Sequence, residues 1–488
     1  DTPGGGQQGS EQKVTYTGTG GVAVGNPLVR AMYAVRFGDI NLLLSGRVNS
    51  ETKILYDRTP RQMVAQVAPW LTLDSDPYPA VVDGRIVWIL DGYTTSNSYP
   101  NSQRNNLANT ISDSTSATRG LGVPGTEINY IRNSVKGYID AYDGTLRLYA
   151  WDTSDPLLQT WMKVYPGLLR PASEIPASLK AHFRYPQDIF KVQRQLLARY
   201  HMTDPDSWYQ QADLWRIPQD PRDKNGALEP PYYLSIRWPD DSGALFSQTT
   251  SFTPNNRENL GAYMSVVADA SSPDYGKIRV LKLSDSQQVP GPNQTYNAIV
   301  TDAGVAAKLL PFVGQGGSGS ATPLYGNLLT LPLGGGLIYV EPIYTQRKDT
   351  AAGSASGSYP VLRFVVVRFG DHIGIGDTLQ EALDTVFSGS AGASTGETAP
   401  SPGPGGAASP SPGGGASAPE STPGPSGSPS PSPSPSPNDQ AAQQALTAAQ
   451  QAFAAADAAL KAGDLATYQQ QIQVAQQKIA EAAQALAG

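Results

Sequence analysis

The 488-residue sequence has no cysteine and no long apolar run. Without cysteine the chain forms no disulfide, uses no catalytic thiol and holds no zinc or iron–sulfur site through thiolates. No apolar stretch approaches the roughly 18–20 residues that a membrane-spanning helix requires. The first residues, DTPGGGQQGSEQK, also lack the charged and apolar regions of a signal peptide. From this abrupt start we expect a piece that was processed or excised from a longer protein.

Basic residues are too few to dominate the charge. The 35 Lys and Arg residues against 42 Asp and Glu residues give a formal net charge of -7 at pH 7. Nucleic-acid-binding proteins usually carry a basic domain or stripe, and the sequence has none. We therefore predict no nucleic-acid partner and no electrostatic attraction to an anionic membrane surface.

Motifs for metals and cofactors are missing as well. The three histidines, His182, His201 and His372, lie far apart and do not have the spacing of metal ligands. The segment GLGVPG at 120–125 has the G-x-G-x-x-G spacing. However, Pro124 lies inside it, and its flanks lack the strand and helix that a dinucleotide site needs. The sequence therefore predicts neither a metal site nor a cofactor.

Strand and helix signals come in separate runs between residues 14 and 387. Two β-rich pairs are joined by Asp83-Gly84 and by Asp143-Gly144, which suit the turns of β-hairpins. A helical stretch follows, and strand signals return from residue 232 onward. This order predicts an α+β fold with mainly antiparallel sheet and a central helical segment. It forms one domain over 14–387, or two subdomains of about 14–230 and 231–387.

Several helices have recognisable starts. Pro27, Pro60, Pro156 and Pro205 each follow an Asn, Thr or Asp in the position of an N-cap. The helix expected after Pro186 has one apolar stripe at three-, four- and seven-residue spacing. The stripe consists of Ile189, Val192, Leu196, Leu197 and Tyr200.

The two ends of the chain differ from the rest. Residues 388–438 are almost entirely Ser, Pro, Gly and Ala, which cannot bury enough apolar surface to offset their ordering entropy. They predict a disordered linker, and residues 1–13 a disordered N-terminus. Residues 439–488 have heptad-like apolar spacing on both sides of Gly463-Asp464, which predicts a helical hairpin. Because so small a hairpin is marginal alone, we expect it to dock on a partner, self-associate or pack on the main domain.

The candidate site residues lie around the two hairpins. In WILDGYTTSNSYPNS an apolar strand ends in hydroxyls, amides and aromatics, which makes Asp91, Tyr93 and Asn97 candidate binding residues. The alternative is that these groups hydrogen-bond the irregular backbone that follows. Asp91, Asp140 and Asp152 have no evident local role and are candidate acid/base residues for hydrolysis of a glycan. The clustered aspartates also leave calcium binding open.

Several runs resemble one uncharacterised family of large bacterial membrane proteins, common in actinobacteria and cyanobacteria. They include GGVAVGNPLVRAMYAVRFGDINLLLS, DPYPAVVDGRIVWILDGYTTSNSYPNS and HFRYPQDIFKVQRQLLARYHMTDPDSWYQQADLW. The resemblance extends from about Tyr16 to Gly463-Asp464. It implies several N-terminal membrane-spanning helices followed by a large extracytoplasmic region, of which this chain is the C-terminal part. It carries over no catalytic residue.

Three hypotheses for function follow. The leading one is a non-enzymatic extracytoplasmic domain that binds, scaffolds or senses partners in the cell envelope, because the sequence has no catalytic constellation and carries a tethered helical hairpin. Its partners would be other envelope proteins or a second copy, and the absent N-terminal part would attach it to the membrane. The alternative is a carboxylate-based hydrolase of a cell-wall polymer, and the weaker alternative is a calcium-binding surface module.

Overall fold

The computed structural model describes most of residues 16–389. The described ranges are 16–46, 48–116, 127–238, 241–284, 288–313, 321–347 and 359–389, with the pairs 2–3 and 13–14 and isolated positions beyond 443. Contacts divide the chain into two units, Asp1–Ser401 and Pro402–Gly488. The linker, nearly all of the predicted hairpin and GLGVPG lie outside the described residues, so the predictions for them stand as predictions.

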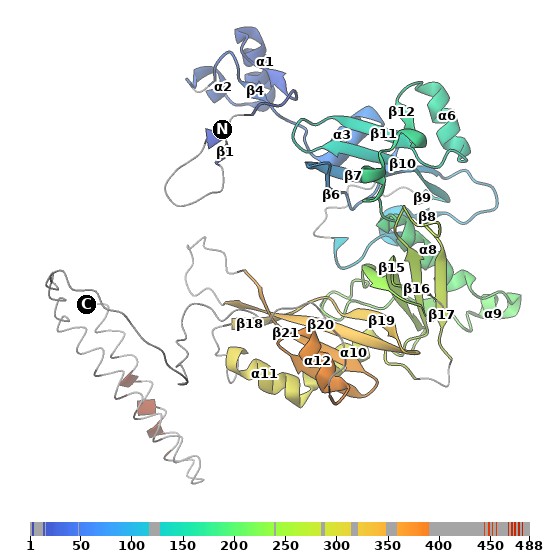
Figure 1. Ribbon diagram of the computed structural model, residues 1–488, viewed down its shortest axis with the longest axis vertical. Helices are drawn as coiled ribbons and strands as arrows, with labels where there is room; N and C mark the ends of the chain where they lie inside the picture. The colour runs from blue at the N-terminus through green and yellow to red at the C-terminus, as the bar shows by residue number, and fades with distance from the viewer. Residues whose placement is uncertain are drawn as a thin grey trace, which may run out of the picture. The chain divides into compact units, whose positions relative to one another are not determined.

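The first sheet contains the two expected hairpins (Figure 1). Its strand order is β12-β11-β10-β7-β5, with β6 beside β7. The strands are β5 (Thr72–Leu73), β6 (Tyr78–Val82), β7 (Arg85–Ser96), β10 (Tyr130–Asp140), β11 (Leu146–Ala150) and β12 (Leu169–Pro171). Only the β11–β12 pair is parallel among these strands.

Two further antiparallel sheets follow in the sequence. The second has the order β13-β15-β16-β17 with β14 beside β15, and the third has the order β18-β20-β21-β22 with β19 beside β20. The second consists of β13 (Trp215–Arg216), β14 (Tyr232–Ile236), β15 (Leu245–Pro254), β16 (Ala262–Val267) and β17 (Ile278–Lys282). The third consists of β18 (Ala321–Tyr325), β19 (Leu329–Leu333), β20 (Gly336–Arg347), β21 (Val361–Phe369) and β22 (His372–Gly376). The predicted α+β class is confirmed.

Short strand pairs and helices complete the described chain. The pairs are β1 (Thr2–Pro3) with β2 (Lys13–Val14), β3 (Val22–Ala23) with β4 (Lys53–Ile54), and β8 (Asn105–Asn106) with β9 (Glu127–Ile128). The helices are α1 (Pro27–Phe37), α2 (Asn41–Leu44), α3 (Pro60–Val67), α4 (Leu107–Thr110), α6 (Pro156–Val164), η1 (Ala172–Glu174), α7 (Ala177–Lys180), α8 (Gln187–Tyr200), α9 (Pro205–Gln210), α10 (Pro292–Thr301), α11 (Ala303–Val313) and α12 (Leu379–Val386). No described helix is long and apolar enough to cross a membrane.

The expected helix starts are confirmed. The side chains of Asn26, Asp155 and Asp204 each accept a hydrogen bond from a backbone N–H in the first turn of α1, α6 and α9. Thr59 precedes α3 without such a bond. A polar cap of this kind satisfies one of the four unpaired N–H groups of a helix start, which is why the Asx-Pro pattern predicts these positions well.

The two predicted hairpin turns have different outcomes. Asp83 and Gly84 have φ of 50° and 76° and form a two-residue turn between β6 and β7, as their sequence predicts. The turn at Asp143-Gly144 is longer, because β10 ends at Asp140 and β11 begins at Leu146. The Asp140 side chain there accepts hydrogen bonds from the backbone N–H groups of Tyr142 and Asp143, which stabilises a wider loop.

Among the described elements that were not anticipated from the sequence, helices α10 and α11 are the longest. Helices α10 and α11 lie in a stretch with β-branched residues and with Pro311 inside the second helix. They bury Ile299, Val305 and Leu309 against the third sheet, so tertiary packing outweighs a weak local preference. Strand β5 has only two residues and is defined by its pairing with β7.

The buried face of α8 also differs from the sequence pattern. Its buried residues are Gln187, Asp188, Phe190, Lys191, Arg194 and Ala198. Leu196 and Tyr200, which belong to the predicted apolar stripe, are 43% and 50% exposed. The helix therefore turns a largely polar face inward.

Each sheet is covered by a helix through apolar side chains. Helices α3 and α6 pack on the first sheet through Val64 and Leu158. Helix α8 packs on the second through Phe190 and Ala198. Helix α12 packs on the third through Ala382. Burial of the Val64, Leu158 and Phe190 side chains contributes about 1.5–3 kcal/mol each, and burial of the alanine methyl groups contributes less.

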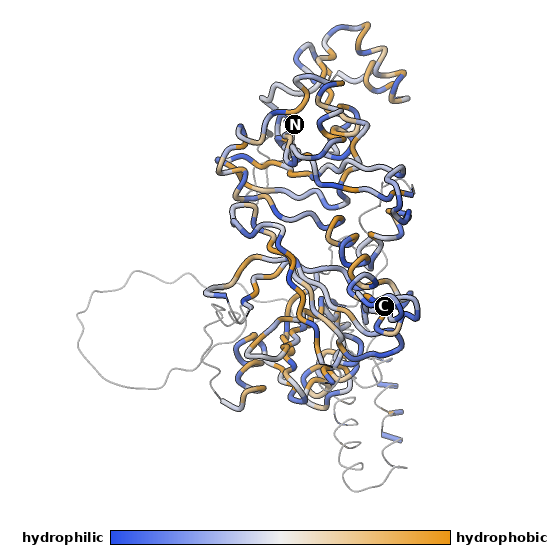
Figure 2. Tube along the Cα trace, turned by 90° about the vertical axis from the view of Figure 1, so that its right-hand side faces the viewer, coloured by the Kyte–Doolittle hydropathy of each residue, from blue (hydrophilic) through white to orange (hydrophobic). Residues whose placement is uncertain are grey.

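Helix α1 is an exception, because it presents apolar side chains to solvent. Figure 2 colours the Cα trace by hydropathy and shows hydrophobic residues along this helix between hydrophilic ones. Leu28, Met32 and Val35 are spaced at i, i+4 and i+7 and are 69%, 64% and 84% exposed. Ile40 and Leu44 of the following segment are also exposed. A contiguous apolar patch of this kind usually marks a contact surface.

Phe190 is fully buried and is a side chain through which α8 packs on the second sheet. We expect Phe190→Ala to lower the free energy of unfolding by about 3–5 kcal/mol, because the change removes apolar contacts and leaves a cavity. Phe246→Ala, at a position 39% exposed, should cost clearly less. Urea unfolding of both variants would measure the difference, and equal losses would contradict the packing described.

Candidate functional site

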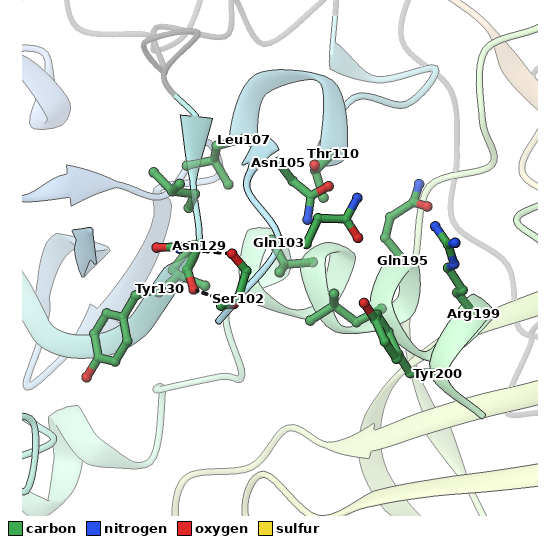
Figure 3. Close-up of a pocket in the computed structure, with 14 residues that line it drawn as sticks. Ser102, Gln103, Asn105, Leu107, Thr110, Asn129, Tyr130, Gln195, Arg199 and Tyr200 are labelled. Atoms are coloured by element: carbon green, nitrogen blue, oxygen red, sulfur yellow. Dashed lines mark hydrogen bonds between the residues drawn. The ribbon is translucent and has the colours of Figure 1, made fainter. Parts of the chain in front are cut away.

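A surface pocket lies where the loop after β7 meets α4, β9 and α8 (Figure 3). Its volume is about 470 Å³, within the roughly 300–1,000 Å³ of small-molecule sites. The lining residues are Ser102, Gln103, Asn105, Leu107, Thr110, Ile128, Asn129, Tyr130, Ile131, Val192, Gln195, Leu196, Arg199 and Tyr200. We call this the first pocket.

Helix α8 supplies one wall of the first pocket. Val192, Leu196 and Tyr200 of the predicted apolar stripe face it, together with Gln195 and Arg199. This explains why the stripe is only partly buried: it forms the wall of a cavity. The stripe is therefore divided: these three residues line the pocket, whereas Leu197 packs on the core of the second sheet.

The loop that forms the opposite wall is held by Asn129. Its side-chain nitrogen donates to the carbonyl oxygens of Tyr99 and Ser102 at 2.8 and 3.2 Å, and its side-chain oxygen accepts from the Tyr99 N–H at 3.1 Å. The rings of Tyr99 and Tyr130 stack with centroids 5.7 Å apart. A single amide and an aromatic pair therefore give the polar half of WILDGYTTSNSYPNS its shape.

Arg199 brings positive charge to the first pocket. Its guanidinium carbon lies 4.5 Å from the centroid of the Trp208 ring, a cation–π contact that holds the side chain in place. Its Nε is buried and has no hydrogen-bond partner within the described structure. Because this atom is enclosed, Arg199 can contribute to ligand binding only through the charge and the remaining donors of its guanidinium group.

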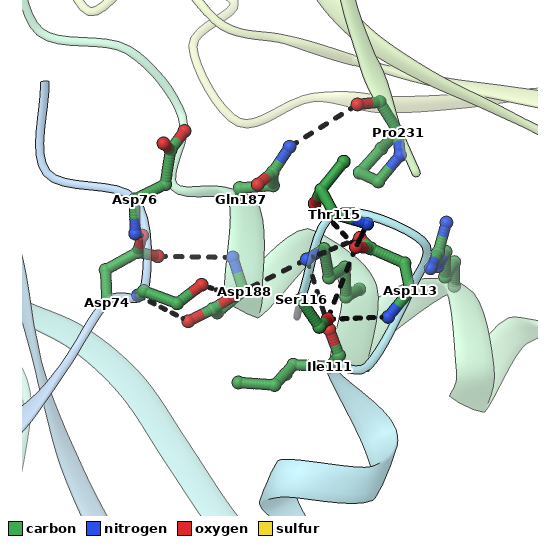
Figure 4. Close-up of polar contacts among 12 residues, drawn as sticks. Asp74, Asp76, Ile111, Asp113, Thr115, Ser116, Gln187, Asp188 and Pro231 are labelled. Carbon is green, nitrogen blue, oxygen red and sulfur yellow. Dashed lines mark hydrogen bonds and ion pairs between the residues drawn. The ribbon is translucent and has the colours of Figure 1, made fainter. Parts of the chain in front are cut away.

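Residues on the buried face of α8 make hydrogen bonds and ion pairs that connect the pocket wall to the rest of the unit (Figure 4). Lys191 Nζ lies 2.6 Å from Asp113 Oδ2 and donates to the carbonyl oxygen of Ile111 at 3.1 Å. Thr115 donates to the same carboxylate through its N–H and its hydroxyl at 2.9 and 2.6 Å. Burial raises the pKa of Asp113, but Lys191 and these hydrogen bonds outweigh burial and hold it below its usual value. The ion pair thus anchors the segment after α4 to α8.

A second set of buried contacts joins α8 to the first sheet. Asp188 accepts hydrogen bonds from the N–H and hydroxyl of Ser75 at 2.7 and 2.8 Å. Asp74 accepts from the Tyr93 hydroxyl and, at 3.2 Å, from the Asp188 N–H. Burial and the neighbouring Asp74 carboxylate raise the pKa of Asp188 to about 7. The candidate residue Tyr93 is therefore an internal hydrogen-bond donor and is 1% exposed.

Asp91 is likewise enclosed. Its carboxylate pairs with Lys136 Nζ on β10 at 2.5 Å and accepts from Asn133 Nδ2 at 3.0 Å. The centroids of the Trp151 and Phe183 rings each lie 5.5 Å from the same ammonium. Burial raises the pKa of Asp91, against the attraction of Lys136. Breaking such a pair typically costs about 3–5 kcal/mol, because it leaves one charge buried and unpaired.

The remaining candidates have local contacts, and Asp140 is buried whereas Asn97 is exposed. Asp140 binds Arg85 Nε at 2.5 Å and caps its loop, and the Arg85 hydrogen bond lowers its pKa to about 2. Asp152 pairs with Arg132 at 2.5 Å. Asn97 is exposed and accepts a hydrogen bond from the neighbouring Ser98 hydroxyl at 3.0 Å. The structure brings none of these three into the described lining of the first pocket, and their functional roles stay predictions.

Sequence reasoning missed most of the buried charges. Besides Lys136 and Lys191, Arg194 is fully buried, and its Nη1 donates to the carbonyl oxygen of Glu229 at 2.9 Å. Burial raises the pKa of Glu229 to about 7 and that of Glu341 to about 8. The segment FKVQRQ places Lys191 and Arg194 among residues of a buried helix face. A solvent-facing helix has the same pattern, so the sequence does not distinguish the two.

Metal binding finds no support in the described residues. No group of three or more His, Cys, Asp or Glu residues lies together there as a metal site would require. The aspartates of the two hairpins are instead engaged with Lys, Arg, hydroxyl and backbone N–H groups. The calcium hypothesis therefore has no candidate site in the described part of the chain.

The fold and the pocket define an α+β protein with a polar surface pocket backed by buried ion pairs. Within that class, the chain belongs to the Uncharacterised protein family (UPF0182), whose profile matches residues 1–312. It is similar to UPF0182 proteins of Kineococcus radiotolerans (48% identical), Paenarthrobacter aurescens (46%) and Streptomyces coelicolor (47%). The family expected from the sequence is confirmed.

These alignments cover 80%, 82% and 78% of this chain, respectively. They cover 40%, 40% and 37% of the relatives, so the chain spans well under half of their length. No solved structure matches the chain.

The raised pKa of Asp188 predicts a defined pH dependence. Between about pH 4 and pH 7 the folded chain keeps a proton on Asp188 that the unfolded chain has released. The contribution of Asp188 to the free energy of unfolding therefore falls as pH rises. Asp188→Asn has no such proton to lose. We therefore expect the variant to gain stability relative to the wild type from pH 4 to pH 7, by at most about 1.4 kcal/mol per pH unit.

Thermal unfolding at several pH values would measure this difference. Asp206→Asn, at an exposed position in the first turn of α9, is the control and should run parallel to the wild type. If the Asp188→Asn and wild-type curves also run parallel, the buried carboxyl does not titrate as described.

Proposed function

We propose that this chain is a non-enzymatic binding domain whose first pocket takes a polar, polyhydroxylated ligand of the cell envelope. The observation that carries the proposal is the chemistry of the pocket lining. Gln103, Asn105 and Gln195 offer amide donors and acceptors, and Tyr200 offers a half-exposed ring beside them. Amides and a tyrosine ring together suit a ligand with hydroxyl groups and flat apolar faces.

The same lining favours binding over hydrolysis. None of its described residues is an Asp, Glu or His. Glycoside hydrolysis usually requires two carboxyl groups on either side of the scissile bond. Asp91, the candidate closest in sequence to the pocket loop, is enclosed with Lys136. The described pocket therefore offers recognition groups without an acid/base pair.

The proposal is tested with a neutral chito-oligosaccharide hexamer as probe. We expect Tyr200→Ala to weaken binding about tenfold, because it removes an aromatic contact of roughly 1–1.5 kcal/mol. Tyr209→Ala is the matched control, since Tyr209 is 84% exposed and does not line the pocket. Isothermal titration calorimetry would give both affinities. Equal affinities for the two variants would place the ligand elsewhere.

We also propose that the domain lies outside the cytoplasmic membrane and contacts the rest of a longer protein through the apolar stripe of α1, formed by Leu28, Met32 and Val35. The location follows only from what the family resemblance implies, and two observations support the contact through α1. The stripe is largely exposed in this chain, and the relatives are more than twice as long as the matched region. Exposed apolar surface of this extent is normally covered in a complete protein.

Replacing Leu28, Met32 and Val35 by Gln tests the stripe. The triple variant should keep the unfolding temperature of the wild type, because exposed substitutions usually change stability by less than about 0.5 kcal/mol. It should bind less of an apolar dye and self-associate less, as measured by light scattering. The control replaces Val67, Val164 and Leu310 by Gln, because each is exposed on a different helix and they do not form a stripe. It should change dye binding and self-association less than the triple variant of α1 does.

In the full-length protein, a photoreactive residue at Val35 should crosslink to a part of the polypeptide outside this chain. Crosslinks only within residues 1–488, or to other proteins, would overturn this assignment.

A further inference from the structure

A second hollow lies beside the first pocket. Its volume is about 410 Å³, and it is lined by Gln195, Trp215, Arg216, Ile217, Pro218, Gln219, Leu228, Thr253, Pro254, Asn256, Arg257, Glu258 and Asn293. These residues come from α8, β13 and the segment after it, the end of β15 and its following turn, and the start of α10. We call it the second pocket.

The two pockets share Gln195. This residue lies on α8 with its neighbours Val192 and Arg199 in the lining of the first pocket only. A side chain that lines both hollows forms the boundary between them. A ligand longer than one pocket would therefore pass over Gln195, whose amide donates and accepts hydrogen bonds.

The charge of the combined lining is opposite to that of the chain. Arg199 lines the first pocket, and Arg216 and Arg257 line the second, against the single acidic residue Glu258. The chain as a whole has a formal net charge of -7. Glu258 Oε2 accepts a hydrogen bond from Asn293 Nδ2 at 3.3 Å, so part of its acceptor capacity is used within the protein.

Packing and strand pairing hold the wall of the second pocket in place. Trp215 is buried and stacks on His201 with ring centroids 3.6 Å apart. Strand β13 pairs with the end of β15 through Trp215 and Arg216. The pairing fixes the backbone from which the exposed Arg216 side chain extends. Less conformational entropy is then lost when Arg216 binds a ligand.

From these observations we propose that the two pockets are subsites of one elongated site for an anionic, polyhydroxylated chain, such as a glycan that bears carboxylate or phosphate groups. This rests on the proposed function and specifies the class of ligand. The first pocket contacts the uncharged face of the chain through amides and Tyr200. The arginines bind its anionic groups, since guanidinium groups match carboxylate and phosphate oxygens in pairs.

Calorimetry with three hexameric probes tests the proposal. The probes are the neutral chito-oligosaccharide, an oligogalacturonate with carboxylates, and an oligomer of glycerol phosphate. We expect at least one anionic probe to bind tenfold or more tightly than the neutral one at 50 mM salt, with the advantage shrinking at 500 mM. Which anionic probe binds more tightly identifies carboxylate or phosphate as the preferred group.

Arg216→Gln is the decisive variant. It should weaken binding of the preferred anionic probe about tenfold and weaken binding of the neutral probe clearly less, because the neutral probe has no anionic group for the guanidinium to bind. Arg237→Gln is the matched control, because Arg237 is also exposed but does not line either pocket. Equal unfolding temperatures for both variants and the wild type would show that neither change disturbs the fold.

Two results overturn the proposal in distinguishable ways. If the neutral probe binds and Tyr200→Ala weakens it, but Arg216→Gln does not affect the anionic probes, the first pocket is a separate site and only this inference fails. If none of the three probes binds, the proposed function fails together with it.

Discussion

The buried ion pair between Lys191 and Asp113 is the contact on which the candidate site depends. Two charges removed from water are stable only when they are close together and their remaining hydrogen-bonding capacity is used. Here the ammonium contacts the carboxylate and the Ile111 carbonyl, and Thr115 donates to the carboxylate. These constraints place the segment after α4 against α8, and this placement forms the first pocket.

Helix α8 therefore has two functions, on two faces. Its buried face carries Asp188, Lys191 and Arg194 and connects to the first and second sheets through hydrogen bonds and ion pairs. Its other face, with Val192 and Leu196, lines the pocket. Loss of any one partner would leave a buried charge unpaired, and desolvation makes an unpaired buried charge costly. Because any movement of α8 would separate these pairs, the pocket wall has little freedom to move.

Local sequence signals predicted the elements well where a polar cap or a tight turn decides the structure. The Asn26 and Asp155 caps and the Asp83-Gly84 turn act within a few residues, so their physics is contained in the sequence. Helices α10 and α11 were missed because their apolar residues are helical only when packed on the third sheet. Asp91 and Tyr93 were singled out as site residues, and the structure encloses both.

The sequence by itself determined the α+β class, the family, the absence of thiol chemistry and the starts of several helices, because composition and short-range spacing decide these properties. Only the tertiary structure decided what the polar residues do. Whether an aspartate or lysine faces water or another charge depends on segments that are far apart in the chain, such as Asp113 and Lys191. The stripe on α8 is the clearest case, because periodicity gives the face of a helix but not what that face contacts.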